Sequence, residues 1–145
     1  MKVRDILQKK SGEVFTIRPH QTLNEASKLL TSKNIGALVV VNDGYAPVGI
    51  ISERDIVRQM AEFGNKTGSL LVGDVMTREV VIALPDDDID YLSNTMTNRR
   101  IRHLPVLADG KLAGIVSIGD VVKAQLAYYE GETRTLHQYI TGSYS

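Results

Sequence analysis

The chain has 145 residues, of which 43% are hydrophobic and 23% are charged, a composition typical of a globular domain with enough length for one substantial core. The 17 basic residues balance the 17 acidic residues, so the net charge gives no general attraction to nucleic acid or to an anionic membrane. The absence of cysteine excludes disulfides, cysteine zinc sites and thiol catalysis.

The first half of the chain predicts a strand, a helix, two strands and a second helix, in that order. Pro19 stops the first strand, and the apolar residues of the helix after it fall on one face. An uninterrupted branched apolar run then suits a strand covered on both faces, and a turn at residues 42–44 leads into the next strand. In the last helix we expect Ile56, Val57 and Met60 to face the core. These predicted elements are the strand Val14 to Arg18, a helix opened by Gln21 and Thr22, the strands Ala37 to Val41 and Val48 to Ile51, and a helix from Ser52 to about Gly64.

The second half repeats this plan. Pro85 aligns with Pro19 at an offset of 66 residues, and after the hairpin turns the offset becomes 65 because the first turn is one residue longer. One unit alone has too few apolar residues to close a core, so we expect the two units to pack sheet to sheet around a shared axis. The repeated elements are the strand Val80 to Leu84, a helix opened by Pro85, the strands His103 to Leu107 and Leu112 to Val116, and a helix from Ser117.

The joints between the units give the predicted domain organisation. A polar, glycine-rich segment at residues 64–71 has the composition of a mobile linker. The first repeat then covers residues 1–63, including a short helix at the N-terminus, and the second covers 72–129. Residues 130–145 are expected to form an amphipathic C-terminal helix and tail. The predicted fold class is α+β, with two pseudo-symmetric β-α-β-β-α repeats and a C-terminal helix.

These repeats carry a recognisable motif. Gly49 to Asp55 and Gly114 to Asp120 both read G-h-h-S-x-x-D, where h is apolar, and the run I-R-H-L-P-V occupies Ile101 to Val106. With its two hairpins, the chain resembles a tandem pair of cystathionine beta-synthase (CBS) domains, called a Bateman module, over nearly its whole length apart from the C-terminal helix. More narrowly it is similar to small stand-alone bacterial members. In such proteins the clefts between the repeats bind adenine nucleotides, most often AMP and sometimes ATP, NAD(H) or S-adenosylmethionine.

The resemblance implies a role for the serine and aspartate of each motif. In the family both residues face the cleft, and the carboxylate accepts hydrogen bonds from ribose hydroxyls; here these residues are Ser52 with Asp55 and Ser117 with Asp120. Each pair also opens a predicted helix, whose positive end favours an anionic ligand. The alternative is a capping box, in which serine and aspartate only satisfy the backbone of their own helix. The two roles do not exclude each other.

Further ligand contacts are expected on the strands that line the clefts. Arg102 and His103, followed on the same strand by Leu104 and Pro105, are the expected phosphate contacts, because a guanidinium and an imidazole both donate to phosphate oxygens. The first repeat has Gly36 and Ala37 at the positions of Arg102 and His103, so we expect two unequal clefts. The remaining ligand-binding candidates, in addition to those already named, are Ile35, Gly36 and Ala37 as a wall for adenine and Thr16 as a contact to the base.

Each of these candidates has a structural alternative. Residues 35–37 could be a plain strand entry, and Thr16 could bond its own backbone. Arg54 and Arg58 could reach a neighbouring phosphate, but like Arg99 and Arg100 they are interpreted as solvent-facing side chains. The two named histidines outside the motif, His20 and His137, have no metal-ligand spacing, and we predict neither a metal nor a catalytic residue.

Three functions follow from this interpretation. The first is a non-catalytic sensor in which an adenine nucleotide bridges the repeats and shifts an interface, in a homodimer or with an unidentified protein partner. An enzyme is disfavoured, because the sequence contains no P-loop, no GxGxxG motif and no converging nucleophile and base. The third is a structural or protein-interaction dimerisation module, with nucleic-acid binding disfavoured by zero net charge. No apolar run approaches the ~20 residues that span a bilayer and no signal peptide is recognised, so a cytoplasmic, non-membrane protein is expected.

Overall fold

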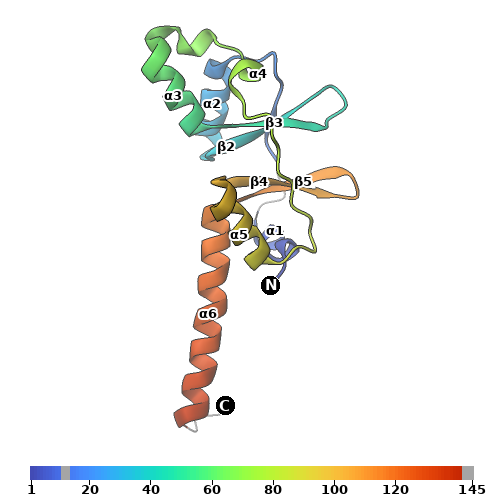
Figure 1. The fold of residues 1–145 in the computed structure, drawn as a ribbon, viewed down its shortest axis with the longest axis vertical. Coiled ribbons are helices and arrows are strands. Elements are labelled where there is room, and N and C mark those ends of the chain that lie inside the picture. Colours follow the sequence, from blue (N-terminus) through green and yellow to red (C-terminus); the bar gives the residue numbers. More distant parts are fainter. Residues whose placement is uncertain (11–13, 142–145) are drawn as a thin grey trace.

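The chain folds into two similar halves that are stacked one on the other, with a long helix extending from the second half (Figure 1). The structure is a computed structural model that describes residues 1–10 and 14–141, with side chains described as far as residue 131. The predicted tail residues 142–145 lie outside this range. The elements are the helices α1 (Val3–Lys9), α2 (Leu23–Lys33), α3 (Glu53–Phe63), α4 (Val72–Val75), α5 (Ile89–Arg99) and α6 (Ile118–Thr141), the 3-10 helix η1 (Gly64–Ser69), and the strands β1 (Thr16–Ile17), β2 (Ala37–Val41), β3 (Pro47–Ser52), β4 (His103–Ala108) and β5 (Lys111–Ser117).

The first half is the predicted strand-helix-strand-strand-helix unit. Its sheet has the order β1-β2-β3, with β1 parallel and β3 antiparallel to the central β2. All five residues of β2 are buried, as expected for a branched apolar strand covered on both faces. Thr22 caps the start of α2 by accepting a hydrogen bond from the backbone N–H of Glu25, and Asn34 ends the helix in the left-handed conformation.

The predicted strand Val80 to Leu84 is wrong. The second sheet contains only β4 and β5, and the segment before α5 makes a single parallel bridge, between Ala83 and Val106. Pro105 occupies the position that Val39 has in β2, and proline has no N–H to donate to a neighbouring strand. The ladder therefore stops at the two hydrogen bonds made by Ala83, to Pro105 and from Leu107.

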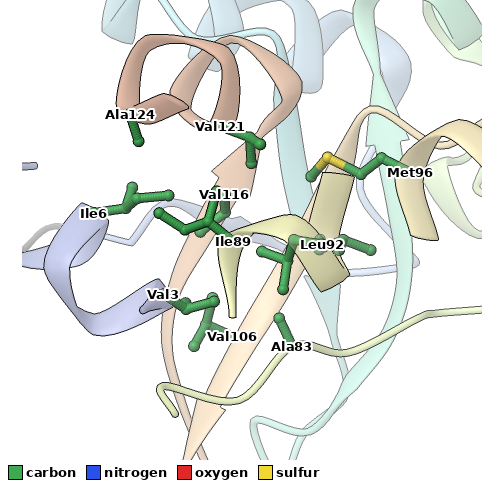
Figure 2. Close-up of a cluster of buried hydrophobic side chains, with 11 residues drawn as sticks. Val3, Ile6, Ala83, Ile89, Leu92, Met96, Val106, Val116, Val121 and Ala124 are labelled. Carbon is green, nitrogen blue, oxygen red and sulfur yellow. The ribbon is translucent and has the colours of Figure 1, made fainter. Parts of the chain in front are cut away.

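Each half has its own hydrophobic core. A short helix that precedes the other half in the sequence completes each core. Val3 and Ile6 of α1 pack into the core of the second half, beside Ile89 and Val116 (Figure 2). Val72 of α4 is buried in the core of the first half. α1 precedes the first repeat in the chain but packs on the core of the second. The exchange ties the halves together, because unfolding one of them exposes apolar surface of the other.

Backbone hydrogen bonds repeat this exchange symmetrically. The N–H of Val72 donates to Gln21 at 2.8 Å, and the N–H of Val3 donates to Asp87 at 3.0 Å. Gln21 and Asp87 are equivalent in the two repeats, at the offset of 66 residues. The two halves are therefore related by a pseudo-two-fold axis, as the sequence repeat predicts, and their small sheets lie next to each other at the middle of the molecule with helices on the outer sides (Figure 1).

Three other expectations change. Residues 64–69 form the 3-10 helix η1, packed on α2 and α3 with Thr67 buried, in place of an irregular linker. Val57 and Met60 of α3 are exposed, 66% and 54% respectively, so they do not face the core; Ile56 alone packs partly against it. The last helix of the second repeat and the predicted C-terminal helix are one continuous helix, α6, which passes through Gly131.

Candidate functional site

A cleft of about 280 Å³ lies between the two halves, at the ends of β3 and β4 where α3 begins. One wall comes from the first repeat and the other from the second. Among the residues expected to bind a ligand, this cleft brings together Gly36, Ser52, Asp55, Arg102 and His103. The other lining residues are Ile50, Glu53, Arg54, Arg58, Thr77, Glu79, Val81, Arg100 and Ile101.

Ser52 and Asp55 form a complete capping box at the start of α3. The Ser52 backbone N–H and hydroxyl both donate to Oδ2 of Asp55, at 2.8 and 2.9 Å, and the Asp55 N–H donates back to the Ser52 hydroxyl at 3.2 Å. The helix-capping interpretation is therefore confirmed. The other carboxylate oxygen of Asp55, Oδ1, makes a weaker contact, with the Arg58 guanidinium at 3.7 Å. This oxygen can accept a hydrogen bond from a ligand hydroxyl without disturbing the cap.

Both walls of the cleft carry cationic side chains. Arg100 and Arg102 come from the second repeat, and Arg54 and Arg58 from the first turns of α3. Within the described part of the chain, only Arg58 of these four arginines has an ion-pair partner, which is Asp55. The guanidinium groups of Arg54, Arg100 and Arg102 are thus available to bind an anion. Arg54, Arg58 and Arg100 are exposed, as expected for solvent-facing side chains, and they also line this cleft.

Gly36 and His103 lie in the same cleft. A Cβ atom added to Gly36 would be 3.5 Å from Nε2 of His103, so the His103 ring lies close to the Gly36 backbone. The sequence analysis assigned the glycine and the Arg102–His103 pair to different clefts because they are equivalent in the two repeats. Around a pseudo-two-fold axis, equivalent residues close to the axis instead face each other.

The partly buried His103 imidazole interacts electrostatically with charged side chains from both halves of the molecule, Glu53 of the first and Arg102 and Asp120 of the second. Burial lowers the pKa of the His103 imidazole below 6.5, and the positive charges of Lys10 and Arg102 lower it further. Asp120 and Glu53 act in the opposite direction but do not reverse the shift. The folded protein therefore favours neutral His103.

This shift predicts a loss of stability in mild acid. A histidine whose folded-state pKa is below 6.5 binds fewer protons than in the unfolded chain, so its contribution is present above that pH and is lost as the pH falls towards the folded-state pKa. Urea unfolding between about pH 7.5 and about pH 5.5 should show this loss. His103→Gln should have a shallower pH dependence, whereas His20→Gln, at an exposed position, should behave like the parent. Equal slopes for His103→Gln and the parent would contradict this prediction.

The second aspartate occupies a different environment. Asp120 lines a smaller cavity of about 150 Å³ between α1 and α6, together with Lys9, Lys10 and Lys123. Lys10 Nζ donates to Oδ2 of Asp120 at 2.7 Å, the same oxygen that accepts the Ser117 N–H at 2.9 Å. Burial would raise the pKa of Asp120, but the hydrogen bonds from Lys10 and Ser117 outweigh it and lower that pKa. The two motifs therefore differ in what surrounds their carboxylates.

The remaining expected ligand contacts lie outside the linings of both cavities. Ala37 and Leu104 are buried in the cores, and Pro105 is buried next to them. The Thr16 hydroxyl lies 3.2 Å from the Tyr45 hydroxyl, at the hairpin. The other residues of this group are Ile35, which packs against the first core, and Ser117, which caps α6.

Several cleft residues were not selected from the sequence. Arg100 is the left-handed C-cap of α5, equivalent to Asn34 after α2, and this equivalence was a usable signal. Thr77 and Glu79 line the cleft because Thr77 exchanges backbone hydrogen bonds with Ile50 of β3, which holds this segment at the cleft. Lys10 could not have been found, because only the fold brings it to Asp120, 110 residues away in the sequence.

Comparison with protein families identifies both halves. The CBS domain family model matches residues 3–62 and 72–127. The mitochondrial CBS domain-containing protein CBSX3 of Arabidopsis thaliana is 37% identical over 150 residues, which cover 98% of this chain and 73% of that protein. Inosine-5'-monophosphate dehydrogenase of Thermoplasma acidophilum is 35% identical over 114 residues, but these cover only 22% of that enzyme.

Solved structures agree with this match. A CBS-domain protein of Agrobacterium tumefaciens has a TM-score of 0.81 at 40% identity, over 86% of this chain and 92% of that one. The CBS domain pair of protein MJ0100, in complex with 5-methylthioadenosine and S-adenosyl-L-methionine, has a TM-score of 0.78 at 30% identity, over 88% and 98% of the two chains. These findings confirm the predicted resemblance and fold class. No helix in the described ranges is long and apolar enough to cross a membrane.

Proposed function

Because this chain belongs to the CBS-domain family, we propose that it is a non-catalytic regulatory module that binds an adenine nucleotide in the cleft between its two repeats. AMP is the first candidate, and NAD(H) and ATP are the others. The protein acts as a cytoplasmic ligand sensor. An enzymatic role is not proposed, because the Ser52 hydroxyl and the Asp55 carboxylate of the cleft bond each other as a helix cap.

The observation that supports this proposal is that Asp55 and four arginines, two from each repeat, line one inter-repeat cleft. A nucleotide has the matching pair of groups, a ribose diol and a phosphate. Oδ1 of Asp55 accepts from the diol, while the guanidinium groups donate to the phosphate oxygens. The first turn of α3 adds its positive helix end to the same cleft.

The structure of MJ0100 with adenosine-containing ligands supports the chemical class of the ligand. Between anionic nucleotides and a cationic adenosine ligand, the cleft of this chain favours the anionic ones. Its four arginines outnumber the carboxylates of Glu53, Asp55 and Glu79. A cationic sulfonium ligand would lose the phosphate contacts, so we place S-adenosylmethionine behind the nucleotides here.

A melting assay with AMP, ADP, ATP, NAD, NADH and S-adenosylmethionine tests this function. At about 100 times its dissociation constant, a ligand specific to the folded state adds ~2.7 kcal/mol. This raises the melting temperature of a domain of this size by roughly 5 to 10 °C. The absence of a shift with every compound in the panel would contradict the proposal and favour the structural alternative.

We also propose that the module is a homodimer. α3 exposes Val57, Met60 and Phe63 on one face, and α6 exposes Leu126 and Tyr129. Apolar faces on two long helices are characteristic of surfaces that pack on a partner. Light scattering during gel filtration should give about twice the monomer mass, and Met60→Glu should shift it towards the monomer. Ala46→Glu, at an exposed position of the β2–β3 turn, adds the same charge and should remain dimeric; a monomeric parent would contradict this assignment.

A further inference from the structure

The helix α6 carries apolar side chains on two sides. Val121 and Ala124 are buried in the core of the second half. Val122, Leu126 and Tyr129 are 45%, 58% and 55% exposed, and at 3.6 residues per turn they share one side of the helix, which faces away from the core. We call these three residues, with the positions that continue them along the helix, the outer stripe. A helix that is apolar on both sides is usually covered on both, so the outer stripe is a surface suited to a partner.

The outer stripe continues in the sequence where α6 extends away from both halves (Figure 1). Its spacing of alternately four and three residues is kept at Thr133, Leu136 and Ile140. The positions that continue the core-facing side, seven and fourteen residues after Val121 and Ala124, hold Tyr128, Gly131, Thr135 and Gln138. The core-facing side thus has no further aliphatic residue here, whereas the outer stripe still has leucine and isoleucine. All these later positions lie beyond residue 127, where the match to the CBS domain family ends.

We propose that the outer stripe pairs with the outer stripe of a second copy, with the two α6 helices parallel and in register, as a two-stranded coiled coil. This inference rests on the proposed homodimer and names the contact that joins its subunits. Alternating spacings of three and four residues average about 3.5, the heptad period that keeps one seam facing a partner helix. Both helices present the same seam, so a second copy matches it along its whole length.

The described surface of α6 suits a closely packed helix. Val122 and Leu126 line an open groove together with Gly119, which lies seven residues before Leu126 and belongs to the same seam. Gly119 has no side chain that would hold a partner backbone away, so two α6 helices can approach closely at the start of the seam. Lys123 and Glu130 also line the groove, at heptad positions where charged residues flank a coiled-coil seam.

Charge decides between the two possible directions of the partner helix. In an antiparallel pair that overlaps along the whole outer stripe, Glu130 lies beside Glu130 of the partner subunit, and these like charges repel. In the parallel pair, Glu130 lies beside Gln125 of the partner subunit, which is uncharged. A shifted antiparallel pair would separate the two glutamates but would leave the end of the outer stripe uncovered. The parallel arrangement is therefore favoured.

Disulfide crosslinking tests this arrangement, because the chain has no cysteine of its own. In a parallel, in-register pair each residue of the outer stripe lies beside its own copy, so Val122→Cys should form a disulfide-linked dimer under mild oxidation. Ala127→Cys, at an exposed position on another side of α6, is the control. We expect Val122→Cys to crosslink about tenfold faster or more, because pairing raises the effective concentration of its thiols. An antiparallel pair would separate the two Val122 positions by roughly 15 Å or more along the helices, too far for a disulfide.

A charge placed in the outer stripe provides the second test. In the Val122→Cys background, Leu126→Glu should slow crosslinking about tenfold or more, whereas Ala127→Glu adds the same charge outside the stripe and should leave the rate unchanged. Far-UV circular dichroism of both variants should remain that of the folded parent. Crosslinking of Val122→Cys that is no faster than that of Ala127→Cys, or that Leu126→Glu does not slow, would overturn the inference. If the parent is then still a dimer in light scattering, the homodimer stands and its contact lies elsewhere; a monomeric parent would contradict both.

Discussion

Asp55→Ala is expected to abolish most of the nucleotide-dependent rise in melting temperature, the roughly 5 to 10 °C estimated for a saturating ligand. Oδ1 of Asp55 is the carboxylate oxygen of the larger cleft that its own helix cap does not use, and alanine has no acceptor to replace it. The unliganded variant should lose about 0.5 to 2 kcal/mol of stability, the range of a lost helix cap. Melting curves with and without AMP measure both quantities.

Asp120→Ala is the matched control for this variant. Asp120 makes the equivalent capping hydrogen bonds with Ser117 at the start of α6, and its removal also breaks the ion pair with Lys10, so this variant should lose more stability than Asp55→Ala. It does not line the larger cleft, and the greater part of the AMP shift should persist. If the two variants lost the shift equally, the assignment of the principal site to the Asp55 cleft would be wrong. If Asp55→Ala failed to fold, the aspartate would be mainly structural.

Gly49→Ala is expected to destabilise the protein by about 1 to 3 kcal/mol, the usual cost of overpacking. A Cβ atom at Gly49 would lie 2.9 Å from the carbonyl oxygen of Thr77 and 2.5 Å from the Met76 sulfur. The methionine side chain can turn away, but the Thr77 backbone is fixed by two hydrogen bonds with Ile50. Thr77 also lines the cleft, so AMP affinity should fall together with stability. Urea unfolding and titration calorimetry measure the two effects.

The repeat supplies the control at Gly114. There the added Cβ atom would meet only the Leu7 side chain, at 2.7 Å from its Cδ2 atom, and the end of a leucine can move more readily than backbone. Gly114→Ala should therefore be less destabilising than Gly49→Ala and should leave AMP binding in the larger cleft unchanged. The reverse order of stabilities would contradict this account of the motif glycines.

The repeat made most of the fold predictable from the sequence. Local signals were sufficient for β2, whose residues 37–41 are all apolar, and for the capping boxes at Ser52 and Ser117. The missing strand at residues 80–84 was also readable in principle, because Pro105 lacks the donor that the ladder requires. The exposure of the apolar face of α3 could not be predicted, since a face that binds a partner and a face that packs on the core have the same helical spacing.

The candidate site was predictable where it depends on the motif and unpredictable where it depends on the symmetry of the fold. Ser52, Asp55, Arg102 and His103 were chosen from the sequence and meet in one cleft. Alignment of the repeats, however, separated Gly36 from His103, although the pseudo-two-fold axis brings them together. Lys10 had no sequence signal at all, because its contact with Asp120 arises from the packing of α1 on the second half.

The central claim is that the cleft between the repeats is a nucleotide site, and a crystal structure of the protein grown with AMP tests it most directly. We expect the ribose next to Asp55 and the phosphate among Arg100, Arg102 and the start of α3. Crystals grown at saturating AMP with no nucleotide in this cleft, or with AMP only at another surface, would contradict the claim.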